Sequence, residues 1–169
     1  MELQREYGLP PILGKDPAVL ILGSFPSKIS LERQYYYANP HNQFWKIMSD
    51  LLNFDSSEGG HSCIEVLKDH HIAVWDVIAS RSYQMGSMDR DIIDPVFNDI
   101  PGFISNHPSI RYIGTNGGKA WECFRKSVNG IHFGRKFITE RLPSTSPAYA
   151  ACLYEQKLLR WQDLLLYIS

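Results

Sequence analysis

The sequence predicts an α/β fold with a central, mostly parallel, four-stranded sheet. Short apolar runs alternate with segments of helical periodicity along the 169 residues, a pattern typical of βαβ units. Loops rich in Gly, Ser, Asn and Pro follow three of the apolar runs. No internal repeat, low-complexity tract or long linker interrupts the pattern, so we expect residues 1–169 to form a single domain.

The first half of the chain contains two expected strands. Residues 18–22 form an apolar run, and residues 23–40 follow as a loop rich in Ser, Tyr, Asn and Pro. Residues 42–53 are expected to form a helix because their apolar side chains recur at three- and four-residue spacing. A short helix over 64–70 then leads to a buried strand over 72–75.

The middle of the chain is expected to continue with a polar loop over 76–85. Asp94 and Pro95 are expected to open a helix, because proline is favoured in the first helical turn. A third strand is expected over 110–114, with a helix over 119–128 after a tight turn.

The last part of the chain supplies the fourth expected strand, over 136–140, and a final helix over 149–168. In open α/β sheets, ligands bind beyond the carboxyl ends of the strands. The polar loops after the first, third and fourth strands therefore predict a shared site at that edge of the sheet.

The composition limits the classes of function. The net charge of −1 argues against a bulk, nonspecific nucleic-acid binder but allows a local basic face. No apolar run approaches the roughly 18 residues of a membrane span, and the amino terminus has no signal pattern. Cys63, Cys123 and Cys152 are widely spaced. We therefore expect an intracellular, cytoplasmic protein with reduced thiols, no metal site and no membrane partner.

The residues after the first strand favour a nucleobase pocket. Three tyrosines and two asparagines lie within the segment 35–45. Aromatic faces can stack on a flat ring, and amides can read its edge or hold a water molecule.

Four motifs in this order carry a family resemblance: Gly-Ser-Phe-Pro-Ser at 23–27, Tyr-Tyr-Tyr-Ala-Asn-Pro-His-Asn-Gln-Phe-Trp at 35–45, Asn-Gly-Gly-Lys-Ala at 116–120 and Leu-Pro-Ser-Thr-Ser-Pro-Ala at 142–148. The set resembles the hypoxanthine-DNA (deoxyinosine) glycosylases, a branch of the uracil-DNA glycosylase superfamily. The resemblance covers nearly the whole chain and implies a three-layer α/β/α, uracil-DNA glycosylase-like fold.

The resemblance implies that Asn39 is the catalytic residue. In the mismatch-specific uracil and thymine glycosylases, an asparagine at the third position of the first motif orients the attacking water, but Phe25 stands there in this chain. A phenyl ring cannot hydrogen-bond water, and the resemblance implies that the role moves to Asn39, whose amide donates and accepts. From the residues alone, Asn39 and Pro40 are also consistent with a turn that caps the next helix.

The resemblance also implies the remaining site residues. The expected base pocket comprises Gly23, Ser24, Phe25, Tyr37, Asn42 and Asn116. The expected DNA contacts are Ser27, Lys28, Lys119, Pro143, Ser144, Thr145 and Ser146. Each has an ordinary structural alternative, such as a glycine turn, a helix cap or a strand-to-helix connection. Asp76, at a strand end, is expected to act as a cap.

One departure from the superfamily concerns the last motif. No histidine lies between Arg141 and Ala151, so the histidine that usually stabilises the leaving base is absent from this motif.

The sequence therefore predicts a monofunctional DNA glycosylase that hydrolyses the N-glycosidic bond of a deaminated base, hypoxanthine first, in base excision repair. We expect a monomer without a cofactor, acting on DNA that contains a deaminated base. Three alternatives stay open: a uracil or thymine mismatch glycosylase, a noncatalytic damaged-DNA-binding module, and an enzyme that acts on free nucleosides.

Overall fold

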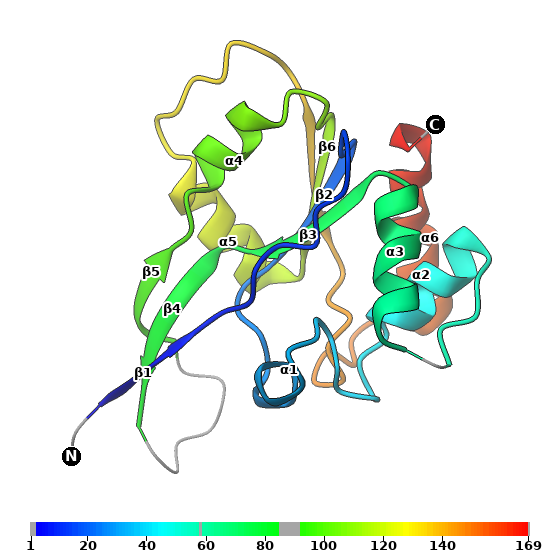
Figure 1. Ribbon diagram of the computed structural model, residues 1–169, viewed down its shortest axis with the longest axis horizontal. Coiled ribbons are helices and arrows are strands. Elements are labelled where there is room, and N and C mark those ends of the chain that lie inside the picture. The colour runs from blue at the N-terminus through cyan, green and yellow to red at the C-terminus, as the bar shows by residue number, and fades with distance from the viewer. Residues whose placement is uncertain (1–2, 58, 85–91, 169) are drawn as a thin grey trace.

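The computed structural model describes residues 3–57, 59–84 and 92–168. Its centre is a four-stranded parallel sheet in the order β3-β2-β6-β7 (Figure 1). The strands are β2 (Val19–Gly23), β3 (Ile72–Asp76), β6 (Tyr112–Asn116) and β7 (Ile138–Leu142). Every residue of β2 is buried, as expected for the central strand of a sheet that is covered on both faces.

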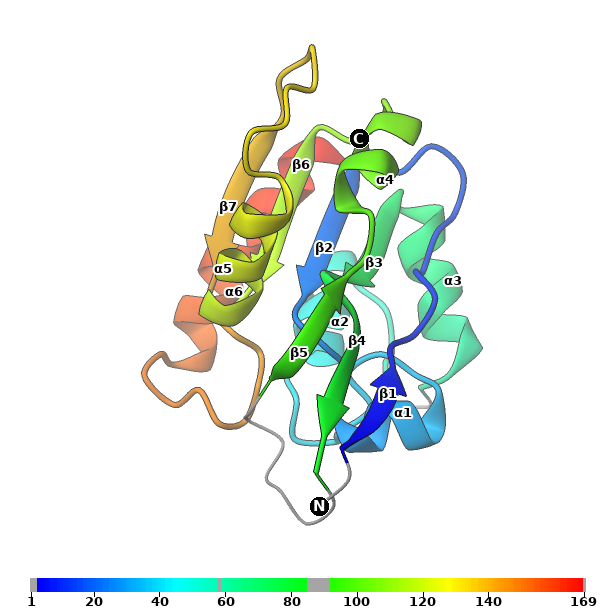
Figure 2. The same ribbon diagram turned by 90° about the vertical axis from the view of Figure 1, so that its left-hand side faces the viewer.

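Helices cover both faces of this sheet (Figures 1 and 2). On one face lie α2 (Phe44–Leu52), α3 (His61–Asp69), α6 (Tyr154–Trp161) and a 3-10 helix (Gln162–Tyr167), which pack against Val19 and Ile21. On the other face lie α4 (Ile100–Asn106) and α5 (Gly118–Ser127), which pack against Leu20 and Leu22. The alternation along β2 confirms the expected three-layer α/β/α fold.

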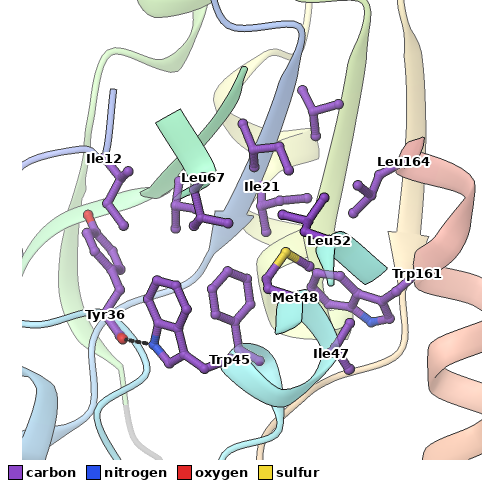
Figure 3. Packing of buried hydrophobic residues seen from close by; sticks show 14 of the residues in the cluster. Ile12, Ile21, Tyr36, Trp45, Ile47, Met48, Leu52, Leu67, Trp161 and Leu164 are labelled. Carbon is purple, nitrogen blue, oxygen red and sulfur yellow. Dashed lines mark hydrogen bonds between the residues drawn. The ribbon is translucent and has the colours of Figure 1, made fainter. Parts of the chain in front are cut away.

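Buried aromatic residues hold the loop that precedes α2 against the core. Phe44 packs edge-on against both Trp45 and Trp161, with ring centroids 5.0 and 6.0 Å apart. The indole nitrogen of Trp45 donates a 2.7 Å hydrogen bond to the main-chain oxygen of Tyr36 (Figure 3). Tyr36 and Trp45 are both buried in the core. The hydrogen bond between them therefore ties the tyrosine segment 35–37 to α2.

A second sheet, which the sequence did not predict, flanks the first. It is antiparallel, in the order β1-β4-β5 (Figure 2), and comprises β1 (Gln4–Tyr7), β4 (Ile78–Tyr83) and β5 (Ile93–Phe97). The expected polar loop over 76–85 was therefore wrong in its described part, and its last residue, Met85, lies outside the described residues.

Long-range pairing explains why β4 was missed. Its hydroxyls at Ser80 and Ser82 receive hydrogen bonds of 3.1 and 2.9 Å from the Arg5 guanidinium, so polar residues stabilise a strand that has little hydrophobic alternation. Asp94 and Pro95 also lie in a strand, at the edge of this sheet, where proline is tolerated. The helix starts later, at Ile100, and is capped by Asp99.

Other boundaries also differ from expectation. The expected loop over 23–40 contains a short helix, α1 (Lys28–Arg33), which Ser27 caps through a 3.2 Å hydrogen bond from the Ser30 main-chain N–H. The final helix begins at Tyr154 and tightens into the 3-10 helix after Trp161. None of the described helices is long and apolar enough to cross a membrane.

Candidate active site

A cavity of about 360 Å³ opens at the carboxyl ends of the parallel strands, the edge that the sequence predicts. Its volume falls within the range of small-molecule sites. The predicted residues that line it are Gly23, Ser24, Phe25, Ser27, Tyr37, Asn39, Asn42, Asn116, Lys119, Ser144, Thr145 and Ser146. Lys28 and Pro143 do not line it. Loops far apart in the sequence therefore converge on one space.

Asn39 lies in a tight turn at the cavity wall. Its side-chain oxygen accepts a 2.9 Å hydrogen bond from the His41 main-chain N–H, and its main-chain oxygen accepts one from the Asn42 N–H. The turn expected from the residues alone is therefore present, but the expected cap is not, because the N-cap residue of α2 is Gln43. Asn39 also lines the cavity. The turn can therefore position Asn39 while the residue still contacts a ligand in the cavity.

Asn42 fulfils the capping alternative, because its side-chain oxygen accepts a 2.9 Å hydrogen bond from the Phe44 N–H at the start of α2. The neighbouring Gln43 connects α2 to the last motif. Its main-chain N–H donates to the Thr145 main-chain oxygen at 3.0 Å, and its side chain accepts a 2.8 Å hydrogen bond from Lys157.

Asn116 joins the loops after β6 and β7. Its side-chain nitrogen donates to the Thr145 hydroxyl, and its side-chain oxygen accepts from the Thr145 main-chain N–H, both at 2.9 Å. Both polar ends of the amide are thus used within the protein. Pro143 anchors the same loop, because its main-chain oxygen accepts a 2.9 Å hydrogen bond from the Trp161 indole.

The tyrosine triplet diverges in space. The Tyr35 ring stacks on Trp45, and the Tyr36 hydroxyl donates to the main-chain oxygens of Leu9 and Pro10. Tyr37 has a left-handed backbone with φ of 53°. This conformation is uncommon for a residue with a bulky side chain and often marks a functional site. Its ring lies 4.2 Å from that of Phe44, by centroid.

Three residues form the floor of the cavity: Gly23, Tyr37 and Asp76. A Cβ atom at position 23 would overlap the Asp76 carboxylate and come within 3.0 Å of the Tyr37 hydroxyl. Only glycine permits this close approach. Burial raises the pKa of Asp76 to about 7. Burial, and to a lesser extent the nearby Asp76, raises the pKa of the Tyr37 hydroxyl. Asp76 caps none of the described helices, so the expected capping role was wrong.

The antiparallel sheet supports the wall at Phe25. The Arg81 guanidinium carbon lies 4.6 Å from the centre of the Phe25 ring, and Arg81 forms a 2.7 Å ion pair with Glu6. Arg81 is only 6% exposed and lines the cavity. Sequence reasoning missed Arg81 because the segment around it read as a polar loop.

Comparison with known proteins identifies the family. No protein-family model matches the chain. The chain is 34% identical over 142 residues to a hypoxanthine DNA glycosylase of Methanosarcina acetivorans, covering 83% of this chain and 86% of the relative. The chain belongs to the hypoxanthine-DNA glycosylases. A second relative of that name, from Methanosarcina barkeri, is 29% identical and covers 70% of this chain and 75% of the relative.

A solved structure supports the same superfamily. The solution structure of a protein from Methanosarcina acetivorans, proposed to be a uracil DNA glycosylase, has a TM-score of 0.81 and 31% identity to this chain. The match covers 98% of this chain and 99% of that one. This hypoxanthine-DNA glycosylase chain therefore has the fold of the uracil-DNA glycosylase superfamily and is a DNA glycosylase.

The glycosylase cavity carries its charged side chains near its rim and floor: Lys119 from the first turn of α5, Arg81 from β4 and Asp76 from β3. Within the described ranges, no three His, Cys, Asp or Glu side chains gather as potential metal ligands.

Proposed function

We propose that this DNA glycosylase removes hypoxanthine from DNA by hydrolysing the N-glycosidic bond of deoxyinosine, in base excision repair inside the cell. The observation that carries the proposal is that Phe25, Tyr37 and Asn39 line one cavity. It offers aromatic faces to a flat base and an amide to a water molecule. The names of the two Methanosarcina relatives support hypoxanthine as the first substrate.

Asn39 is the proposed catalytic residue. Its oxygen is held by the His41 N–H, which fixes the direction of the amide. An amide fixed in this way can hydrogen-bond a water molecule and present it to the sugar carbon of an extruded nucleotide. Extrusion costs a few kcal/mol and is cheapest for a mispaired base, which favours a lesion over a paired base.

Gly23, Ser24, Phe25, Tyr37, Asn42 and Asn116 are the proposed walls of the base pocket. Phe25 is held on one side by Arg81, so its ring can present a fixed face for stacking. Asn116 supports the pocket through Thr145, because its amide is already paired there.

The proposed contacts to the DNA backbone come from three segments. These are Ser27 and Lys28 at the start of α1, Lys119 in the first turn of α5, and residues 143–146 in the loop after β7. Main-chain N–H groups, hydroxyls and ammonium groups are the usual partners of phosphates. We propose that the protein acts as a monomer and that the hydrolysis uses neither metal nor organic cofactor.

Uracil is the second candidate base, and the solved relative proposed to be a uracil DNA glycosylase supports it. A pyrimidine is smaller than a purine, so the cavity does not exclude it on size.

The test is base release from matched duplexes that contain hypoxanthine, xanthine, uracil or a thymine mismatch, with hot alkali to reveal abasic sites. The proposal predicts the fastest release from the hypoxanthine duplex and no strand cleavage before alkali. Preferential uracil release would overturn the substrate assignment. Salt-sensitive DNA binding without release of any base would overturn the enzymatic proposal, and release from free deoxyinosine alone would overturn the DNA substrate.

A further inference from the structure

We propose that Asp76 is a second catalytic residue, whose protonated carboxyl donates a hydrogen bond to a carbonyl oxygen of the departing base. This inference rests on the proposed glycosylase reaction, and it assigns to Asp76 the stabilisation of the leaving group.

The position of Asp76 supports a direct contact with a ligand. The residue ends β3, lines the cavity and is 4% exposed. Its carboxyl lies where a side chain at Gly23 would otherwise stand. The absence of a side chain at Gly23 therefore leaves room for the Asp76 carboxyl.

An unpaired oxygen on the cavity floor points to an unused hydrogen-bonding capacity. Among the described residues, Asp76 Oδ2 is a buried side-chain oxygen without a hydrogen-bond partner. Leaving a buried polar group unpaired costs about 1–3 kcal/mol, and native proteins rarely do so without a functional reason. Asp76 is thus a residue of the cavity lining whose carboxyl has unused hydrogen-bonding capacity.

The surroundings favour the uncharged carboxyl below about pH 7. The titratable and charged groups that face the cavity with Asp76 are Tyr36 and Tyr37 from the segment before α2, Arg81 from β4 and Lys119 from α5. Burial raises the pKa of Asp76 to about 7. Burial also raises the pKa values of both tyrosines, so these stay neutral.

A neutral carboxyl has the chemistry that the leaving base needs. In the hydrolysis, water oxygen bonds to the sugar C1′, the C1′–N bond breaks and its electron pair leaves on the base. The water proton ends on the released base. Negative charge thus spreads onto the base carbonyl, and an O–H donor fixed beside that oxygen stabilises it. A carboxylic acid that a protein keeps neutral by burial can act in this way. Asp76 keeps its own proton, so it is a hydrogen-bond donor and no general acid.

The inference accounts for a departure in the last motif. No histidine lies between Arg141 and Ala151 to stabilise the leaving base. Asp76 reaches the same cavity from another strand. Its ionised form would oppose the reaction, because a carboxylate would repel the departing anion.

The test compares the pH dependence of kcat/KM for the intact wild-type chain with that of Asp76→Asn, on a deoxyinosine duplex. An amide still donates a hydrogen bond but cannot ionise. We expect the wild-type value to fall about tenfold for each pH unit above about 7. We expect Asp76→Asn to stay within about tenfold of the wild type near pH 6 and to lose this alkaline fall. Asp55→Asn is the matched control, because Asp55 is exposed and does not line the cavity.

Asp76→Ala, which has no donor, should lose at least about 100-fold near pH 6. The proposal is overturned if Asp76→Asn keeps the alkaline fall of the wild type, or if folded Asp76→Ala releases base at nearly the wild-type rate. If Asp76→Ala fails to fold, the pH profile of Asp76→Asn still decides. Failure of the wild type to release any base would instead contradict the proposed function itself.

Discussion

Asn116 and Thr145 form a reciprocal pair of 2.9 Å hydrogen bonds, in which the side-chain amide meets both the hydroxyl and the main-chain N–H of the threonine. Thr145 is completely buried. Residues 29 positions apart in the sequence are thereby joined, which links the loops after β6 and β7 at the cavity.

Asn116→Ala should therefore loosen the loop after β7. It leaves the Thr145 N–H and hydroxyl without their partner, and we expect a loss of about 1–3 kcal/mol in the free energy of unfolding, measured by urea denaturation. Thr145→Val removes only the hydroxyl bond and should cost less. Equal losses for the two variants would contradict the reciprocal arrangement.

Gly23→Ala should damage the cavity floor. The added methyl group would overlap the Asp76 carboxyl and press on the Tyr37 hydroxyl, so we expect lower stability and a loss of base release of at least about tenfold. The diagnostic measurement is a double-mutant cycle in urea unfolding. In the Asp76→Ala background the cost of Gly23→Ala should shrink, because the space is then free. Strict additivity would show that the two residues do not contact one another.

The stability of the protein should depend on the titration of Asp76. Its pKa rises from 3.8 to about 7 on folding, so the folded state binds the proton more tightly. The carboxyl's contribution to stability is therefore fully present below about pH 4 and is lost as the pH rises through about 7. Relative to Asp76→Asn, the wild type should lose about 2–4 kcal/mol of unfolding free energy between about pH 5 and pH 8. A pH-independent difference between the two proteins would show that Asp76 titrates normally.

The sequence predicted the parallel sheet because three of its strands, β2, β3 and β6, contain short apolar runs. The edge that carries the cavity follows from parallel topology. It could not predict the antiparallel sheet, because β4 is paired through Arg5, which lies 75 and 77 residues from Ser80 and Ser82. No local pattern reports such a pairing. The same long-range contact brings Arg81 to the cavity.

The motifs identified most cavity residues, but not what each side chain contacts. Asn116 was expected at the base edge; it lines the cavity, and its amide also pairs with Thr145. Asp76 was expected to cap a helix, yet it lies on the cavity floor. Both contacts depend on the register of neighbouring strands. Gly23 approaches Asp76, for example, because the two residues are partners at the carboxyl ends of β2 and β3. Sequence spacing does not encode this register directly.

Asn39 is the residue on which the proposed hydrolysis depends most directly. Asn39→Asp is its matched comparison, because aspartate keeps the oxygen that accepts from the His41 N–H but lacks the amide donor. Comparing Asn39→Asp with Asn39→Ala therefore separates the loss of the turn from the loss of the amide donor. Circular dichroism and duplex binding verify that each variant is folded and still binds DNA.

The decisive measurement is the single-turnover rate of hypoxanthine release by folded Asn39→Ala. We predict a loss of at least about 100-fold relative to the wild type, with DNA affinity largely retained. Release at the wild-type rate would contradict the assignment of the water-positioning role to Asn39.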